Sequence, residues 1–94
     1  MRVDAELSLA VQAELRTLSL GDASDFFRQL RKVCEDPLRN SQAFHDKKIS
    51  GYLLRRFSFG VGVERIAVFH YDGQTVKVIR CRLSKPRRRR SPDD

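Results

Sequence analysis

Residues 63–83 read VERIAVFHYDGQTVKVIRCRL and carry the clearest secondary-structure pattern of the chain. Apolar and polar residues alternate over 63–71 and again over 75–83, which is the period of a β-strand with two different faces. Asp72 and Gly73 lie between the two runs, and glycine supplies the positive φ of a primed two-residue turn. The stretch therefore predicts an antiparallel β-hairpin.

Working outward from this hairpin, residues 52–59 form a further strand-like run that is rich in aromatic and branched residues. Gly60 and Gly62 provide the reversal between this run and the hairpin. Residues 37–50 have weak periodicity and many polar groups. We interpret them as a loop with one turn of helix around 41–45.

The first half of the chain predicts a strand and a helix. Residues 1–7 alternate, which predicts a short strand whose inward side chains are Val3, Ala5 and Leu7. Residues 8–19 repeat leucine and valine at helical spacing, with Ser8 as the expected N-cap. Gly21 is expected to end this helix.

A second helix is predicted after Gly21. Asp22 and Asp25 have the spacing of a capping box, with aspartate in place of the usual glutamate. Apolar residues then recur at helical spacing, and Asp36-Pro37 ends the helix because a residue before proline avoids helical angles.

These elements predict an α+β fold with the order β-α-α-β-β-β, in which a helical hairpin packs on one face of an antiparallel sheet. A chain of 94 residues makes a single domain. We place this domain at residues 1–84 and expect residues 85–94, which carry no apolar core position, to form a flexible basic tail.

The charge of the chain is unevenly distributed. Its net charge is +7, but residues 1–46 sum to −2 and residues 47–94 to +9. No apolar run approaches the about 20 residues of a membrane span. The charged start and the two cysteines, Cys34 and Cys81, favour a reduced cytoplasmic protein without a metal centre or cofactor.

The basic half carries arginines on neighbouring predicted strands. Arg55 and Arg56 are adjacent, so they point to opposite faces of the sheet, while Arg65, Arg80 and Arg82 lie on the next two strands. Guanidinium groups that gather on one face are expected where a polyanion binds, and the alternative is an ordinary solvated face.

Aromatic residues are interleaved with these bases, and Tyr52 and Tyr71 are the candidates for stacking on nucleotide bases. His45 is expected to be exposed, and His70 to be partly buried beside Ile66 and Val68. Paired carboxylates are absent from residues 47–84, so a nuclease would use arginine and lysine to stabilise the charged transition state.

Three motifs together resemble the RelE/ParE superfamily of small bacterial toxins, and most closely its YoeB branch. They are ISGYLLRRF at 49–57, ERIAVF at 64–69 and VIRCR at 78–82. The resemblance covers nearly the whole chain, including the Asp-Pro after the second helix. It implies the toxin of a type II toxin–antitoxin system, which an antitoxin protein holds inactive.

The resemblance also implies candidate site residues. The phosphate-binding arginine of the family falls on Arg65, the paired strand arginines fall on Arg55 and Arg56, and the closing Cys-Arg falls on Cys81-Arg82. RelE-type members use lysine and arginine for proton transfer, and the residues placed for that role here are Lys47, Lys48, Arg82 and Lys85.

The chain departs from the YoeB pattern at two catalytic positions. The general-base glutamate of that branch falls near Ala43, and its late histidine near Ser84. The family's C-terminal tyrosine has no counterpart after Tyr71.

Three activities fit the resemblance. The leading one is metal-independent cleavage of mRNA on the ribosome, in which a 2′-hydroxyl attacks the adjacent phosphate. The alternatives are a ParE-like inhibitor of DNA gyrase without nuclease chemistry, and a non-toxic RNA-binding relative. The expected partners are a cognate antitoxin together with mRNA or gyrase, and no membrane or small-molecule cofactor is expected.

Overall fold

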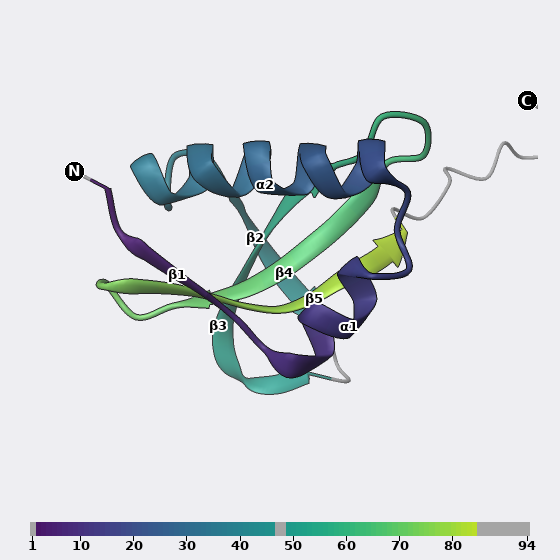
Figure 1. Cartoon of the computed structure of the whole chain (residues 1–94). Helices are drawn as coiled ribbons and strands as arrows, with labels where there is room; N and C mark the ends of the chain where they lie inside the picture. Colours follow the sequence, from purple (N-terminus) through teal and green to yellow (C-terminus); the bar gives the residue numbers. More distant parts are fainter. Residues whose placement is uncertain (1, 47–48, 85–94) are drawn as a thin grey trace, which may run out of the picture.

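The predicted hairpin lies inside a β-sheet in the computed structural model, which describes residues 2–46 and 49–84 (Figure 1). Its strands are β4 (Arg65–Tyr71) and β5 (Thr75–Ser84), paired antiparallel. On the far side of β4 lies β3 (Ile49–Phe59), also antiparallel. The described part of the chain is thus an α+β structure, as predicted, with two helices and five strands in the order β1-β5-β4-β3-β2.

Two strands differ from the prediction. β2 (Gln42–Asp46) occupies a segment that was expected to be a loop with a helical turn, and it pairs antiparallel with β3. Its periodicity is too weak to identify it, and its backbone acquires partners only from β3. β1 (Asp4–Leu7) pairs parallel with β5, so the sheet is mixed instead of entirely antiparallel.

The turn between β4 and β5 has three residues, 72–74, instead of the predicted two. Gly73 has the expected positive φ of 93°, but Asp72 does not have a positive φ, so Asp72 and Gly73 do not form the predicted primed turn. The Asp72 carboxylate instead accepts hydrogen bonds from the backbone N–H groups of Gln74 and Thr75, both at 2.8 Å. These bonds lower the pKa of Asp72.

The first helix, α1 (Leu9–Leu15), begins as predicted, with Ser8 as its N-cap. It ends earlier than expected because the N–H groups of residues 16–18 bond to carbonyls three residues back instead of four. The second helix, α2 (Leu20–Glu35), is capped by Ser19, so Gly21 lies inside it and does not end α1. Its end before Asp36 agrees with the Asp-Pro signal.

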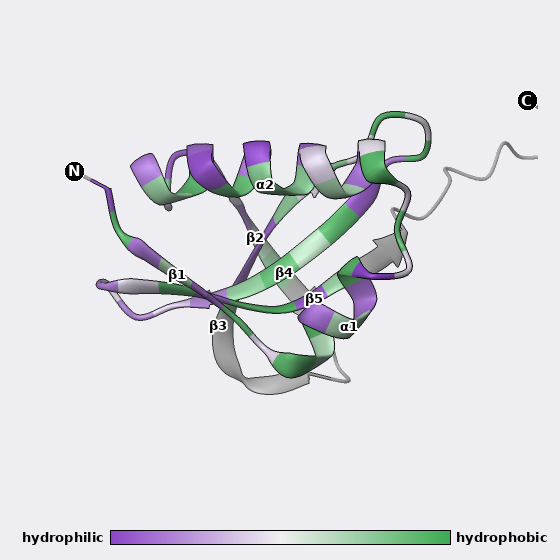
Figure 2. Cartoon of the chain, viewed as in Figure 1, coloured by the Kyte–Doolittle hydropathy of each residue, from purple (hydrophilic) through white to green (hydrophobic). Residues whose placement is uncertain are grey.

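Both helices pack on one face of the sheet (Figure 1). Val11 of α1 and the inward side of α2 meet the sheet in one core, and the apolar side of α2 faces the strands (Figure 2). Phe26 lies at its centre, with ring centroids 5.7 Å from Phe57 and 5.2 Å from Phe59. Val3 and Leu7 pack against this core as predicted, whereas Ala5 is exposed.

The other face of the sheet carries a second, smaller apolar cluster. Leu54, Ile66 and Val68 are buried there, with Phe44 and Ile79 packed against them. The central strand β4 therefore has buried residues on both faces. Neither helix in the described part has the length and apolar character needed to cross a bilayer.

α1 is attached to β5 by a side chain as well as by packing. The register of β5 shifts between Val78 and Arg80, which interrupts the regular pairing with β4. Close to this shift, the backbone N–H of Cys81 donates to the Glu14 carboxylate at 2.8 Å. A carboxylate of α1 thus satisfies a buried donor at the irregular point of the sheet.

The loop 60–64 between β3 and β4 turns back over the N-terminal end of α2. Gly60 begins this loop with a φ of 114°, and a Cβ added there would lie 2.3 Å from the Val63 carbonyl oxygen. At Gly62 an added Cβ would meet nothing within 4 Å. The backbone conformation therefore requires glycine at position 60 but not at position 62.

We therefore expect Gly60→Ala to lower the free energy of unfolding by about 2 kcal/mol or more, since it adds a steric clash to an unfavourable φ. The matched control Gly62→Ala should change it by less than about 0.5 kcal/mol. Urea unfolding followed by circular dichroism measures both values. Equal losses in the two variants would contradict the assignment.

Candidate functional site

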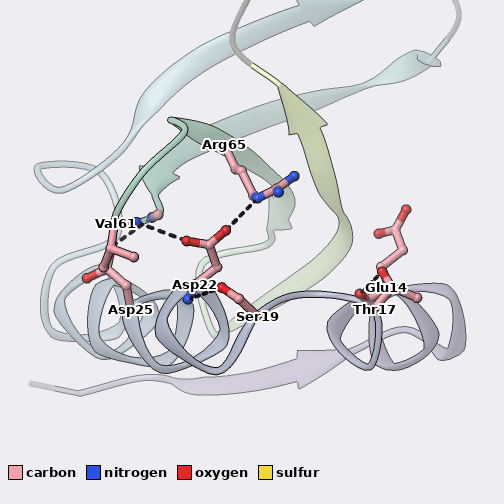
Figure 3. Close-up of polar contacts among 8 residues, drawn as sticks. Glu14, Thr17, Ser19, Asp22, Asp25, Val61 and Arg65 are labelled. Atoms are coloured by element: carbon pink, nitrogen blue, oxygen red, sulfur yellow. Dashed lines mark hydrogen bonds and ion pairs between the residues drawn. The ribbon is translucent and has the colours of Figure 1, made fainter.

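Two carboxylates of α2 lie buried against the loop 60–64 (Figure 3). Asp25 Oδ2 accepts the backbone N–H of Gly60 at 2.8 Å, and Asp22 Oδ1 accepts that of Val61 at 3.0 Å. Asp22 Oδ2 accepts a hydrogen bond from Nε of Arg65 at 2.9 Å. We call these five residues the aspartate cluster.

The ion pair fixes the orientation of Arg65, the residue that the resemblance assigns to phosphate binding. The Arg65 side chain is 22% exposed and that of Asp22 is 9% exposed. Only Nε is engaged with Asp22, and Figure 3 shows the two terminal nitrogens of the guanidinium directed away from that carboxylate. That edge of the guanidinium group has the geometry for bidentate binding of a phosphate.

The hydrogen bond from the Val61 N–H lowers the pKa of the Asp22 carboxyl, and the hydrogen bond from Arg65 lowers it further. Burial acts in the opposite direction but is the smaller effect. Asp22 is therefore held as a carboxylate, which keeps the charge opposite Arg65 in place.

The sequence did not reveal the structural role of Asp22 and Asp25, because their spacing indicated a capping box. The cap is Ser19, whose hydroxyl accepts the N–H of Asp22 at 3.1 Å. A signal was nevertheless present, because Asp22 lies four residues before Phe26 and so falls on the apolar stripe of α2. A carboxylate on such a stripe needs a partner from another element.

Local geometry also supports the cluster. Both aspartates lie in the first two turns of α2, where the positive end of the helix dipole favours negative charge. Gly21 permits the close approach of the loop, since a Cβ there would lie 3.1 Å from Cγ2 of Val61.

The structure does not bring Arg55 together with Arg65. In the register of β3 and β4, Arg65 pairs with Phe59, four residues along β3 from Arg55. At about 3.3 Å a residue the two positions are about 13 Å apart along the strand. Arg55 instead holds the loop after α2: its Nε donates to Ser41 Oγ at 2.6 Å and its Nη2 to the Ser41 carbonyl at 3.0 Å.

Arg56 lies on the opposite face of the sheet from Arg55, as the adjacent positions predicted. It pairs with Val68 of β4, and Val68 pairs on its other side with the exposed Arg80 of β5. Arg56 and Arg80 thus flank Val68 on one face, whereas Arg55 and Arg65 belong to the other, so the sheet divides between its two faces the arginines that were expected to gather on one side.

Of the remaining catalytic candidates, the structure describes only the backbone of Arg82. Arg82 belongs to β5, and Ser84 of the same strand pairs with Arg65, so the end of β5 lies beside the aspartate cluster. The side chain of Arg82 lies outside the described part of the structure. Lys47 and Lys48 lie outside the described residues, as does the predicted tail 85–94, to which Lys85 belongs.

Two further candidates are placed by the core. His70 is half-buried, as predicted. Tyr71 packs against the main core, which leaves less of its ring for stacking than the sequence suggested. The described segments contain no group of three or more His, Cys, Asp or Glu side chains that could share a metal ion.

The sequence matches none of the protein-family models against which it was compared, and a search of curated proteins finds no match either.

We expect Asp22→Asn to remove a pH-dependent part of the stability. The folded pKa of Asp22 is below its ordinary 3.8, so the carboxylate stabilises the fold above that value. This contribution is lost as the pH falls through the lowered pKa. The variant should be less stable than the unmodified chain at neutral pH, and the difference should shrink in acid.

Urea unfolding at about pH 7 and about pH 3 measures this difference. Glu35→Gln, at the exposed far end of α2, is the control and should show no comparable change. A stability difference for Asp22→Asn that stays constant with pH would exclude the proposed charge interaction.

Proposed function

We propose that this chain is the toxin of a type II toxin–antitoxin system, a RelE-like, ribosome-associated endonuclease that cleaves mRNA without a metal ion. The observation that carries the proposal is the guanidinium of Arg65. Asp22 holds it through Nε alone, and its terminal nitrogens are directed away from that carboxylate (Figure 3).

The order of the elements supports the same proposal. The resemblance implies an N-terminal strand, two helices and a closing set of strands, and the described chain has these in that order with β2 in addition. Of the net charge of +7, residues 47–84 alone carry +6, so the positive charge belongs mainly to the segment that contains β3, β4 and β5. A positive surface of this kind attracts the RNA backbone.

The proposed reaction is a transesterification within the RNA. The 2′-oxygen loses its proton and attacks the adjacent phosphorus, the bond to the 5′-oxygen breaks, and that oxygen takes up a proton. The products are a 2′,3′-cyclic phosphate and a 5′-hydroxyl. Arg65 stabilises the negative charge that develops on the phosphate oxygens. Proton transfer is assigned to Lys47, Lys48, Arg82 or Lys85.

Two variants separate a role in RNA chemistry from a role in folding, because both break the same ion pair. Arg65→Gln removes the cation, and cleavage should fall about 100-fold. Asp22→Asn keeps the cation, and cleavage should stay within about tenfold of the unmodified chain. Cleavage is measured on mRNA in translating ribosomes with a chelator present, by mapping the new 5′-hydroxyl ends.

Equal loss of cleavage in both variants, at matched thermal stability, would show that Arg65 acts only through the fold. Growth arrest on expression of the unmodified chain, with all mRNA intact, would exclude the nuclease.

The second candidate function is inhibition of DNA gyrase in the manner of ParE. It is favoured by position 43, where the YoeB branch has its general base: here Ala43 is exposed on β2 and pairs with Arg55. In a supercoiling assay with purified gyrase, this candidate predicts trapped DNA breaks, and the nuclease predicts none.

A further inference from the structure

A second basic site lies at the other end of α2, away from the aspartate cluster. It is a pocket of about 290 Å³ between the C-terminal half of α2, the loop 37–41 and β3. Lys32 of α2, Arg39 of the loop and Arg56 of β3 all line it, and none of its described lining residues is acidic. We call it the basic pocket.

The pocket exists because the sheet is incomplete at this point. β2 begins at Gln42, which pairs with Arg56, so the pairing of β3 on that side ends there. Phe57 and Ser58 continue β3 beyond this point and line the pocket together with Val33, whose side chain is buried. A partly apolar floor thus lies beneath a polar rim.

The rim is held in place before any ligand binds. Arg55 donates from Nη2 to the carbonyl oxygens of Leu38 and Ser41, at 3.1 and 3.0 Å, and from Nε to Ser41 Oγ. The Asn40 side chain donates to the Lys32 carbonyl at 2.6 Å. The loop that carries Arg39 is therefore tied both to the sheet and to α2, which reduces the entropy lost on binding.

The balance of charge at the pocket is positive. The C-terminal end of α2 contributes a partial charge of about −0.5, which disfavours an anion. Its last carbonyls are largely satisfied, because the Asp36 N–H bonds to those of Lys32 and Val33. Three basic residues line the pocket, and the described chain shows no ion pair to any of them.

We infer that the basic pocket binds a phosphorylated ribonucleotide. Its basic residues suit a phosphate group, and its volume of about 290 Å³ lies at the lower end of the range for small-ligand sites. Its side-chain amides can bond to the edge of a base. The amides of Gln29 and Asn40 already donate to Asp25 Oδ1 and to the Lys32 carbonyl, so it is their oxygens, together with the amide of Gln42, that face this task. The same chemistry comes from a free mononucleotide or from one nucleotide of a single-stranded RNA, and neither depends on cleavage at Arg65.

Binding is tested on the full chain with three probes: adenosine monophosphate, adenosine and a short single-stranded RNA. Fluorescence anisotropy measures RNA binding, and NMR titration of backbone amides measures the two small probes. We expect the monophosphate to shift amides of residues 32, 39–42 and 56–58, and adenosine to bind at least about tenfold more weakly.

The double variant Lys32→Gln, Arg56→Gln should weaken binding about tenfold. Its matched control, Arg31→Gln with Lys77→Gln, removes the same charge from two exposed residues outside the pocket and should change binding less than about twofold. Thermal unfolding of both double variants shows whether each is folded.

A free mononucleotide and a nucleotide within RNA give different results, and either result supports nucleotide binding in the basic pocket. Tighter binding of RNA than of the monophosphate identifies a nucleotide within RNA, and the reverse identifies a free mononucleotide. Adenosine that binds as tightly as its monophosphate, amide shifts that lie elsewhere, or equal weakening in the control would overturn the inference. The amide shifts of the unmodified chain decide the matter even where the double variant does not fold.

Discussion

Burial of the Asp22 and Asp25 carboxylates is the constraint on which the arrangement of α2 depends. A carboxylate buried without donors is strongly unfavourable, so α2 can pack as it does only when Gly60, Val61 and Arg65 supply theirs. The same hydrogen bonds therefore fix the position of the helix, the path of the loop 60–64 and the direction of the Arg65 guanidinium. The residue most important to the proposed chemistry is oriented by the same bonds that stabilise the fold.

An arginine also fixes the other end of α2, but in a different way. Arg55 donates to oxygens of the loop that follows the helix, so its role is structural. Arg65 lies on the same face of the sheet but is proposed to bind a ligand. Arg55 and Arg56 are adjacent in the sequence but lie on opposite faces of the sheet. Arg55 supports the loop, and Arg56 lines the basic pocket. Adjacent arginines in a strand thus perform unlike tasks because they face opposite sides.

The features that the sequence predicts correctly are those with local causes. Alternation marks β4 and β5, the hydroxyl of Ser8 caps α1, and Asp36-Pro37 ends α2. Two of the features it misses are local, the Ser19 cap of α2 and the three-residue turn 72–74, but the others depend on residues far apart in the chain. β2 has weak periodicity and gains its structure from β3, and the aspartate spacing of α2 suits a cap and a buried ion pair equally well. Arg65 was found by resemblance, and its partner Asp22 only by the fold.

The parallel pairing of β1 with β5 has a consequence for how the chain acquires its structure during synthesis. Asp4 pairs with Thr75 and Leu7 with Val78, so the first strand finds its neighbour only when nearly all of the domain has been translated. Contacts of such long sequence separation slow folding. A nascent chain therefore cannot complete its sheet until β5 has left the ribosome, and a truncated product that ends before β5 lacks the strand that joins β1 to the rest of the molecule.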